Sequence, residues 1–344
     1  MQTFKKIIMS CLIFIGILSI ISVVVIEPMI QFGMYYYCDG NYRDHTAGEY
    51  ELFFMGDSDG LAAFSPSIFQ KYTGLKSYNL SGEKNTSTSE YYLLDKELKR
   101  NPARTVILQV GIDTFLRDYS TEHSEGNAVT LMRTNSFIER VGFLVKYEHF
   151  DKWLDVYSGI MTRGILCWER QLTQNNDSIF NGQLKGWHKL YSVDLSLNEK
   201  EALEIYNTEE LDCEFRSDRV EEFLSIINMC KDYGAEVIVV MVPMADRYIW
   251  KKVNCDDIYD RINSLCVENN TPFLDFNLFK DRYELFSDKY SFKDSIHLSA
   301  DGAESFTKRL AEIYTGNKFD SSLFYDSYEF MKADSPYAQY LDNN

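Results

Sequence analysis

Two long apolar runs constrain the fold of this chain more than any other feature. They are residues 104–111 (RTVILQVG) and 235–242 (AEVIVVMV), and each is almost free of charged side chains. A near-continuous apolar run of this length is typical of a strand buried on both faces, as in a parallel sheet with helices on both sides. Both runs therefore predict central strands of an α/β domain.

Shorter signals complete an alternation of strands and helices. Further strands are expected at 51–56, 77–80 and 272–276, and helices at 66–74, 86–100, 218–233, 256–269 and 300–314. Strands that alternate with helices imply right-handed crossovers and a parallel sheet. We expect a three-layer α/β/α domain over residues 51–316, preceded by a connector at 28–50 and followed by a C-terminal tail at 317–344.

Residues 114–217 interrupt this alternation. They lie between the third and fourth expected strands, which is far too long for a simple crossover, and they show helix-like spacing from about 135 to 172. We interpret them as an inserted helical cap over the carboxyl edge of the sheet. The alternative is a surface decoration.

The N-terminus predicts a membrane segment. Lys5 and Lys6 precede residues 7–26, a run without charge that is long enough to cross a bilayer as a helix. The basic flank should stay cytoplasmic, so residues 1–27 are expected to be a transmembrane signal anchor at the cell membrane, with the rest extracytoplasmic. The alternative is a cleaved signal peptide, although the run ends VVVIEP, without a small-x-small cleavage site.

Composition excludes several classes of function. The formal charge of −17 over 344 residues argues against nucleic-acid binding, which needs basic patches. Seven cysteines show neither C-x-x-C nor zinc spacing, so buried thiols are expected, with one or two disulfides as the alternative. The chain contains no glycine-rich dinucleotide or phosphate loop and no cluster of metal ligands, so no cofactor and no metal are expected.

Residues suited to nucleophilic catalysis occur at both ends of the domain. Ser58 follows the first strand in FFMGDSDG, and SFKDSIHL places Asp294 three residues before His297, ahead of the last helix. Ligands of parallel sheets bind beyond the carboxyl ends of the strands, where these segments should meet. We predict Ser58 as nucleophile, His297 as its base and Asp294 as the group that orients the base. The alternatives are a turn or cap serine, a structural histidine and a solvated loop acid.

The other four histidines, at positions 45, 123, 149 and 188, lie in the connector or the insertion and lack an acid at matching spacing. An acyl intermediate also needs donors for its oxyanion. The backbone N–H groups of Ser58 and Gly82 are candidates, although Gly82 is equally suited to an ordinary turn. Asp113 follows the third strand at the same edge.

These segments resemble the four sequence blocks of the SGNH (GDSL-type) hydrolase superfamily. The blocks correspond to residues 56–58 (GDS), Gly82 in YNLSG, residues 111–113 (GID) and residues 294–297 (DSIH). The resemblance covers about residues 50–315 outside the insertion. With the N-terminal segment, it extends to the membrane-anchored branch that includes the D-alanyl-lipoteichoic acid protein DltD and alginate-type O-acetylation proteins, which work beside a membrane-bound O-acyltransferase. It implies a flavodoxin-like fold and acyl-ester chemistry at Ser58.

One block departs from the superfamily pattern. Its third block carries an asparagine as oxyanion donor, whereas this chain has Asp113. An ionised carboxylate accepts hydrogen bonds and repels an oxyanion, so Asp113 contributes to an oxyanion hole only when protonated or by positioning another donor. Asn85 is an alternative source of an amide. This departure favours a slow esterase, a transferase or a site that has lost catalysis.

Two functions are therefore expected. The first is an extracytoplasmic, membrane-anchored serine acyl esterase or O-acyltransferase that acts on a cell-envelope polysaccharide or acyl ester, with a membrane-bound O-acyltransferase as partner. The alternative is a non-catalytic SGNH-fold protein that binds or assembles with such an acyltransferase, because fold alone does not fix function.

Overall fold

The computed structural model describes residues 2–21, 24, 25, 27, 48–101, 103–116, 123–134, 137–173, 185–316 and 320–341. Within these residues, five parallel strands form one sheet in the order β2-β1-β3-β4-β5. The strands are β1 (Leu52–Met55), β2 (Ser77–Asn79), β3 (Thr105–Gln109), β4 (Glu236–Met241) and β5 (Phe273–Asp275). Each lies within a predicted segment, so the predicted parallel sheet is confirmed.

Helices cover both faces of the sheet, as expected for an α/β/α fold. One face packs against α4 (Pro66–Thr73) and α14 (Ala300–Thr315), and the other against α5 (Ser87–Arg100), α10 (Ser217–Asp232) and α12 (Cys255–Glu268). Successive strand residues point to opposite faces. Leu52 and Phe54 therefore pack on the side of α4 and α14, while Phe53 and Met55 pack on the side of α5, α10 and α12. The order 2-1-3-4-5 places the topological switch point, where such sheets bind ligands, between β1 and β3.

Local signals account for where the flanking helices begin and end. Pro66 stands at the first position of α4, and Gly74 ends that helix in the left-handed conformation at φ 79°. The Thr86 side chain caps α5 by accepting from the Ser89 N–H, and Ser299 caps α14 by accepting from Gly302.

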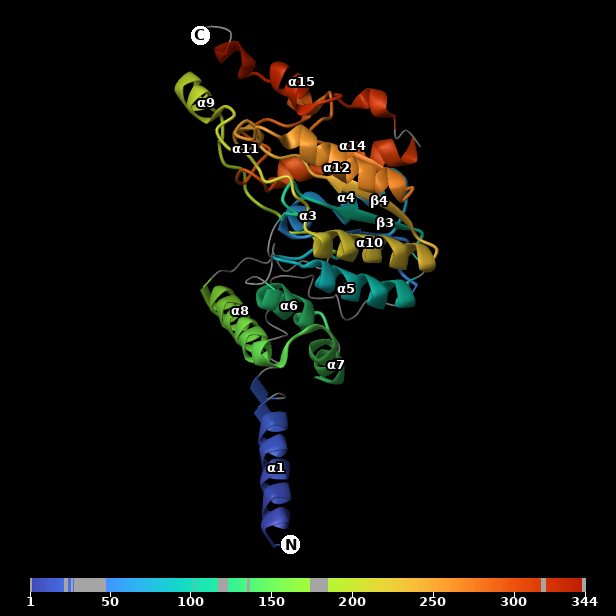
Figure 1. Ribbon diagram of the computed structural model, residues 1–344, viewed down its shortest axis with the longest axis vertical. Helices are drawn as coiled ribbons and strands as arrows, with labels where there is room; N and C mark the ends of the chain where they lie inside the picture. The colour runs from blue at the N-terminus through green and yellow to red at the C-terminus, as the bar shows by residue number, and fades with distance from the viewer. Residues whose placement is uncertain are drawn as a thin grey trace.

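The insertion divides into two parts. Helices α6 (His123–Met132), α7 (Phe137–Tyr147) and α8 (Trp153–Thr173), with the short η3 (Phe150–Lys152), form a group beside α5 (Figure 1). Residues 185–198 then return across the domain, followed by α9 (Glu199–Ile205). In this return, the His188 N–H donates to the Leu61 carbonyl and the Ala300 N–H donates to the Leu190 carbonyl. The second part therefore lies along the serine-bearing and histidine-bearing segments.

The N-terminal segment differs from its prediction. Helix α1 (Gln2–Ile21) extends away from the domain, includes Lys5 and Lys6, and ends before the apolar run does (Figure 1). Among the helices of the described residues, none combines the length and the apolarity that a bilayer crossing requires. The transmembrane helix expected at 7–26 is therefore not confirmed.

The C-terminal segment packs against the domain. Its helical elements are η5 (Ser321–Leu323), α15 (Tyr328–Ala333) and η6 (Ala338–Tyr340). The buried Tyr328 hydroxyl donates to Asp275 Oδ2 at 2.6 Å, and the Ser335 hydroxyl donates to Asp246 Oδ2 at 2.8 Å. Asp246 in turn pairs with Arg282 at the start of α13 (Arg282–Leu285), so the tail is joined to a buried ionic group.

The cysteines whose side chains are described are free thiols: Cys213, Cys230, Cys255 and Cys266. Burial raises the pKa of the Cys230 thiol to about 12, so it stays protonated and unreactive. The interpretation as buried thiols is confirmed for Cys230, Cys255 and Cys266. The side chains of Cys11, Cys38 and Cys167 lie outside the described residues.

Candidate active site

Ser58 stands at the junction of β1 and a short helix, α3 (Ser58–Ala63). The Asp57 carboxylate caps this helix by accepting from the Asp59 N–H at 2.9 Å. Gln109, at the end of β3, accepts from the Asp57 N–H at 3.0 Å. A Cβ atom at Gly56 would lie 2.8 Å from Gln109 Cβ, so the close approach of β1 to β3 requires glycine there. The turn that presents Ser58 is therefore fixed by the neighbouring strand.

The structure brings His297 and Asp294 to Ser58. His297 Nε2 lies 2.9 Å from Ser58 Oγ, and His297 Nδ1 lies 2.9 Å from both carboxylate oxygens of Asp294. Asp294 also accepts from two backbone N–H groups of its own loop, those of Ile296 at 3.1 Å and of His297 at 2.9 Å. These bonds fix the imidazole between the carboxylate and the hydroxyl.

The electrostatics favour the protonation states that a base needs. Burial alone would raise the pKa of Asp294, but hydrogen bonds from the side chain and backbone of His297 outweigh it and lower this pKa to about 2. The ionised carboxylate accepts the proton on Nδ1, which leaves the lone pair of Nε2 directed at the Ser58 hydroxyl. The arrangement can therefore withdraw a proton from Ser58.

Two further carboxylates that sequence reasoning missed lie near the imidazole. Asp59 Oδ1 is 3.4 Å from His297 Nε2 on a nearly buried side chain. Burial raises the pKa of Glu83, while Arg163 and His297 lower it. Asp59 adjoins the predicted nucleophile, but the helix α3 that turns it toward His297 was not predicted. A positive charge that develops on the imidazole would be stabilised by the Asp294 and Asp59 carboxylates.

The candidate oxyanion donors differ in their present partners. Ser58 occupies the first position of α3, where a backbone N–H has no acceptor within the helix. The Gly82 N–H donates to the Gly56 carbonyl at 3.2 Å, and the Asn85 amide donates to the same oxygen at 2.9 Å. Two of the candidate donors therefore converge on Gly56, immediately before the Asp57-Ser58 turn.

Asp113 lies at the carboxyl end of β3 beside Gly111. A Cβ atom at Gly111 would lie 3.3 Å from Asp113 Oδ1 and 3.9 Å from Asp59 Oδ2, so both carboxylates approach the same point of the sheet edge. The loop is stabilised by Thr114, which accepts from the Gly111 N–H at 2.7 Å. The third predicted block thus brings a carboxyl group to the site where the superfamily pattern has an amide.

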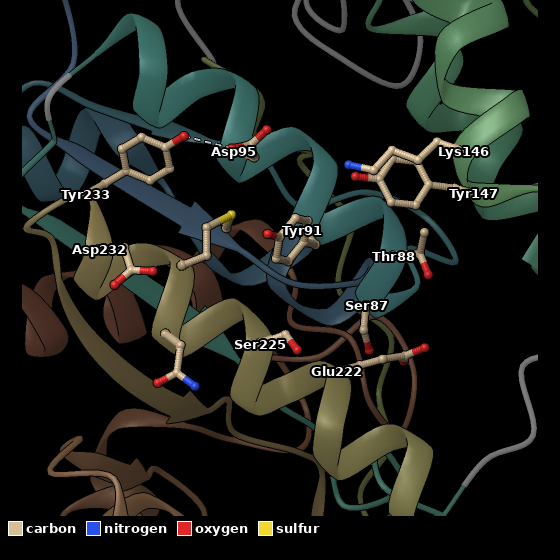
Figure 2. Close-up of a pocket in the computed structure, with 12 residues that line it drawn as sticks. Ser87, Thr88, Tyr91, Asp95, Lys146, Tyr147, Glu222, Ser225, Asp232 and Tyr233 are labelled. Atoms are coloured by element: carbon tan, nitrogen blue, oxygen red, sulfur yellow. Dashed lines mark hydrogen bonds between the residues drawn. The ribbon is translucent and has the colours of Figure 1, made fainter.

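One cavity in the described part of the chain lies away from the triad. It has a volume of about 710 Å³ and is bounded by Tyr91 and Asp95 of α5, Tyr233 beside α10, and Lys146 and Tyr147 of α7 (Figure 2). Tyr233 donates to Asp95 Oδ1 at 2.8 Å across it. Because Ser58, Asp294 and His297 do not line this cavity, it is not the space in which Ser58 would react.

A smaller space adjoins the Asp57-Ser58 turn. It has a volume of about 20 Å³, room for about one water molecule, and is bounded by Asp57, Glu90 and Gln109. Burial, together with the charges of Asp57 and Glu222, raises the pKa of Glu90 to about 8.

The described residues contain no group of three His, Cys, Asp or Glu side chains placed to hold a metal ion.

Two of the remaining histidines lie in the described parts of the insertion. His149 is exposed at the start of η3, and His188 lies in the return segment. His45 and the side chain of His123 lie outside the described residues.

Comparison with known proteins supports the resemblance seen in the motifs. The profile of the family described as DltD protein matches residues 169–315, a range that includes Asp294 and His297 but not Ser58. No curated protein sequence matches the chain. The chain is therefore similar to the DltD family over residues 169–315, as the motifs predict.

Two solved structures are similar to this chain. A proposed acylhydrolase from Bacteroides fragilis NCTC 9343 shares 10% identity over 78% of this chain and 88% of its own, with a TM-score of 0.36. A GDSL-like lipase from Bacteroides thetaiotaomicron VPI-5482 shares 12% identity over 82% of this chain and 99% of its own, with a TM-score of 0.37.

Proposed function

We propose that this chain, similar to the DltD family over residues 169–315, is a serine enzyme that makes or breaks acyl esters. The observation that carries the proposal is the unbroken line of hydrogen bonds from Ser58 through His297 to Asp294, each at 2.9 Å. This geometry meets the requirement that a serine hydroxyl have a base within hydrogen-bond reach and that the base be oriented by a third group.

The reaction follows from that geometry. His297 Nε2 takes the Ser58 proton as Ser58 Oγ adds to the carbonyl of an acyl ester, and the Asp294 carboxylate stabilises the imidazolium. The Ser58 N–H, which has no acceptor within α3, would bind the resulting oxyanion. The imidazolium then gives its proton to the departing alcohol, which leaves an acyl group on Ser58. In the second half, His297 takes a proton from water or from an acceptor hydroxyl as its oxygen adds to the acyl carbonyl. The imidazolium returns this proton to Ser58 Oγ as the bond from the acyl carbon to Ser58 breaks, which releases the free acid or the new ester.

The acceptor and the cellular setting form part of the same proposal. We propose a cell-envelope polysaccharide or its acyl ester as substrate and a membrane-bound O-acyltransferase as partner, by similarity to the DltD family. We also propose that residues 1–27 hold the domain at the outer face of the cell membrane. The uncharged run at 7–26 and the exposed apolar side chains of α1, including Ile7, Leu12 and Phe14, support this placement.

The proposal is tested by labelling the full-length protein with a fluorophosphonate probe and locating the adduct by mass spectrometry. We expect an adduct on Ser58 that is lost in Ser58→Ala and His297→Ala proteins. Ser67→Ala, which alters an exposed serine on the neighbouring helix α4, is the matched control and should label like wild type. A folded protein that gives no Ser58 adduct would refute the proposed chemistry.

A second function is favoured by the state of the donors. Because Gly82 and Asn85 both bond to the Gly56 carbonyl, and Asp113 replaces an amide donor, the fold also suits a non-catalytic partner that binds or assembles with a membrane-bound acyltransferase. The two functions differ in one genetic outcome. If a Ser58→Ala gene restores a deletion strain as fully as the wild-type gene, the binding function holds and the enzymatic one does not.

A further inference from the structure

The loop that carries Gly82 is held by the insertion. Residues 80–85 connect β2 to α5 and lie against α6. Arg133, the residue directly after α6, is fully buried and donates to the carbonyl oxygens of Leu80 and Ser81, the latter at 2.7 Å. A guanidinium presents several donors in a rigid fork, so one side chain fixes two successive carbonyls of this loop.

The second of these bonds acts directly on the candidate oxyanion donor. The carbonyl of Ser81 and the N–H of Gly82 belong to one planar trans peptide unit, so they point in opposite directions. Arg133 holds the carbonyl end of that unit, which fixes the direction of the N–H at the other end. This N–H now reaches the Gly56 carbonyl at 3.2 Å, beside the Asp57-Ser58 turn. Arg133 therefore governs the Gly82 donor without touching the reacting atoms.

A second contact presses α6 against the same loop. A Cβ atom at Gly126 of α6 would lie closer than 3.0 Å to the Lys84 carbonyl oxygen, so only glycine allows the helix to come this near. One residue on, the fully buried Asn127 accepts from the Ser89 hydroxyl at 3.0 Å, in the first turn of α5. The loop is thus fixed at its start by Arg133, near its end by Gly126, and just beyond by Asn127.

We propose that α6 and Arg133 form a clamp that positions the Gly82 N–H, and that Arg133 is a positioning residue for acyl transfer. The insertion is then a working part of the active site and not a surface decoration. This inference rests on the proposed function, because the clamp matters to catalysis only if Ser58 is acylated.

The test compares two reactions at the same position in full-length Ser58→Cys protein. With p-nitrophenyl acetate, the sulfur adds to the carbonyl, forms an oxyanion and expels p-nitrophenolate. With iodoacetamide, the sulfur displaces iodide at a saturated carbon and no oxyanion forms. Both rates are read by mass spectrometry on the peptide that contains position 58. Hydrogen exchange over residues 80–86 reports the loop itself.

Four further substitutions are introduced separately into that background. Gly126→Ala forces α6 away from Lys84, and its matched control is Gly142→Ala on α7, where an added Cβ meets nothing within 4 Å. Arg133→Met removes the fork, and Arg133→Lys keeps its charge with a single donor group. Gly126→Ala also keeps the test informative if Arg133→Met fails to fold.

We expect Gly126→Ala and Arg133→Met to slow acetylation about 100-fold, as a donor displaced by about 1 Å would. Alkylation should stay within about twofold of the parent, as expected for a reaction that needs no oxyanion donor. Hydrogen exchange over residues 80–86 should rise in both variants. The acetylation rate of Arg133→Lys should lie between those of the parent and Arg133→Met, and Gly142→Ala should match the parent. Equal losses in both reactions, or no loss in acetylation, would overturn the inference.

The proposed function fails separately. One outcome would be that the thiol of the parent Ser58→Cys protein is alkylated but never acetylated, while Gly126→Ala still raises hydrogen exchange over residues 80–86. The clamp would then exist without the acyl chemistry, and the catalytic role of Arg133 would be refuted. Unchanged exchange in Gly126→Ala would refute the clamp itself.

Discussion

Replacement of Asp294 by asparagine tests the orientation of the base most directly. The Asp294 carboxylate now accepts the proton on His297 Nδ1 at 2.9 Å while Nε2 faces Ser58 Oγ at 2.9 Å. In Asp294→Asn the amide can donate to Nδ1, which places the ring proton on Nε2. The imidazole would then donate to Ser58 instead of accepting its proton, so the base would be held in the wrong tautomer.

The structure separates the catalytic cost of this change from its structural cost. The wrong tautomer and the loss of the charge beside the imidazolium should lower acylation by about 10⁴-fold, or about 5 kcal/mol. The amide oxygen can still accept from the Ile296 and His297 N–H groups, so the loop should keep its shape. Because 50% of the Asp294 side chain is exposed, solvent screening keeps the loss of unfolding free energy below about 1 kcal/mol.

The assay is the burst of p-nitrophenolate from p-nitrophenyl acetate, read beside urea unfolding. Asp301→Asn, which removes an exposed acid in the first turn of α14, is the matched control for net charge and should keep the wild-type burst. A burst in Asp294→Asn within tenfold of wild type would refute the orienting role of Asp294. An equal loss in Asp301→Asn would assign the effect to charge alone.

The same carboxylate makes a prediction about acid stability. Its pKa of about 2 in the folded state lies below the value near 4 expected for an unfolded aspartate. The stability that this shift contributes is present above about pH 4 and is lost as the pH falls from about 4 to about 2. In Asp294→Asn protein, the urea midpoint should therefore fall less steeply as the pH is lowered through this window. An equally steep fall in the variant would contradict the assignment.

Four further substitutions test the surroundings of the site. Gly56→Ala would place a Cβ atom 2.8 Å from Gln109 Cβ, so we expect a loss of about 2 kcal/mol in unfolding free energy; an unchanged urea midpoint would contradict this. Glu90, with its pKa raised to about 8, keeps a proton that the unfolded chain releases above about pH 4.5, so stability should fall as the pH rises from 4.5 to 8. Glu90→Gln should remove that slope and gain on the order of 2 kcal/mol at pH 8, measured by thermal unfolding at both pH values. Arg282→Met should cost about 3–5 kcal/mol by leaving the buried Asp246 carboxylate unpaired, and adding Asp246→Asn should recover part of it in urea unfolding.

The sheet was predictable because its evidence lies within each segment. The buried strands β3 and β4 are near-continuous apolar runs, as expected for strands covered on both faces. The ends of helix α4 are indicated by Pro66 at its first position and Gly74 just after its last. Helix α3 gave no such signal, since its six residues follow a Gly-Asp turn and contain a glycine of their own. Helix α6 likewise contains a glycine and lacks a clear apolar stripe, so its packing and not its pattern stabilises it.

The site shows the same division between local and distant evidence. Asp294 and His297 were predictable because their spacing within one loop already brings the carboxylate to the imidazole. Asp59 adjoins the nucleophile, yet its approach to His297 depends on α3, and Glu83 approaches only through the fold of the 80–85 loop. Arg133 was out of reach for the same reason, because it contacts residues more than 50 positions away. Contacts of that separation follow from topology and not from a sequence pattern.

The two halves of the site are stabilised by different means, and this bears on the choice between hydrolysis and transfer. The base side is held within one loop, where Asp294 bonds to the backbone and ring of His297. The same imidazole activates water and a polymer hydroxyl alike, so the base side does not discriminate between acceptors. The donor side depends on the insertion, since Arg133 holds the peptide unit that carries the Gly82 N–H. A group that shifts α6 as it binds would therefore alter the oxyanion donor and leave the base side unchanged.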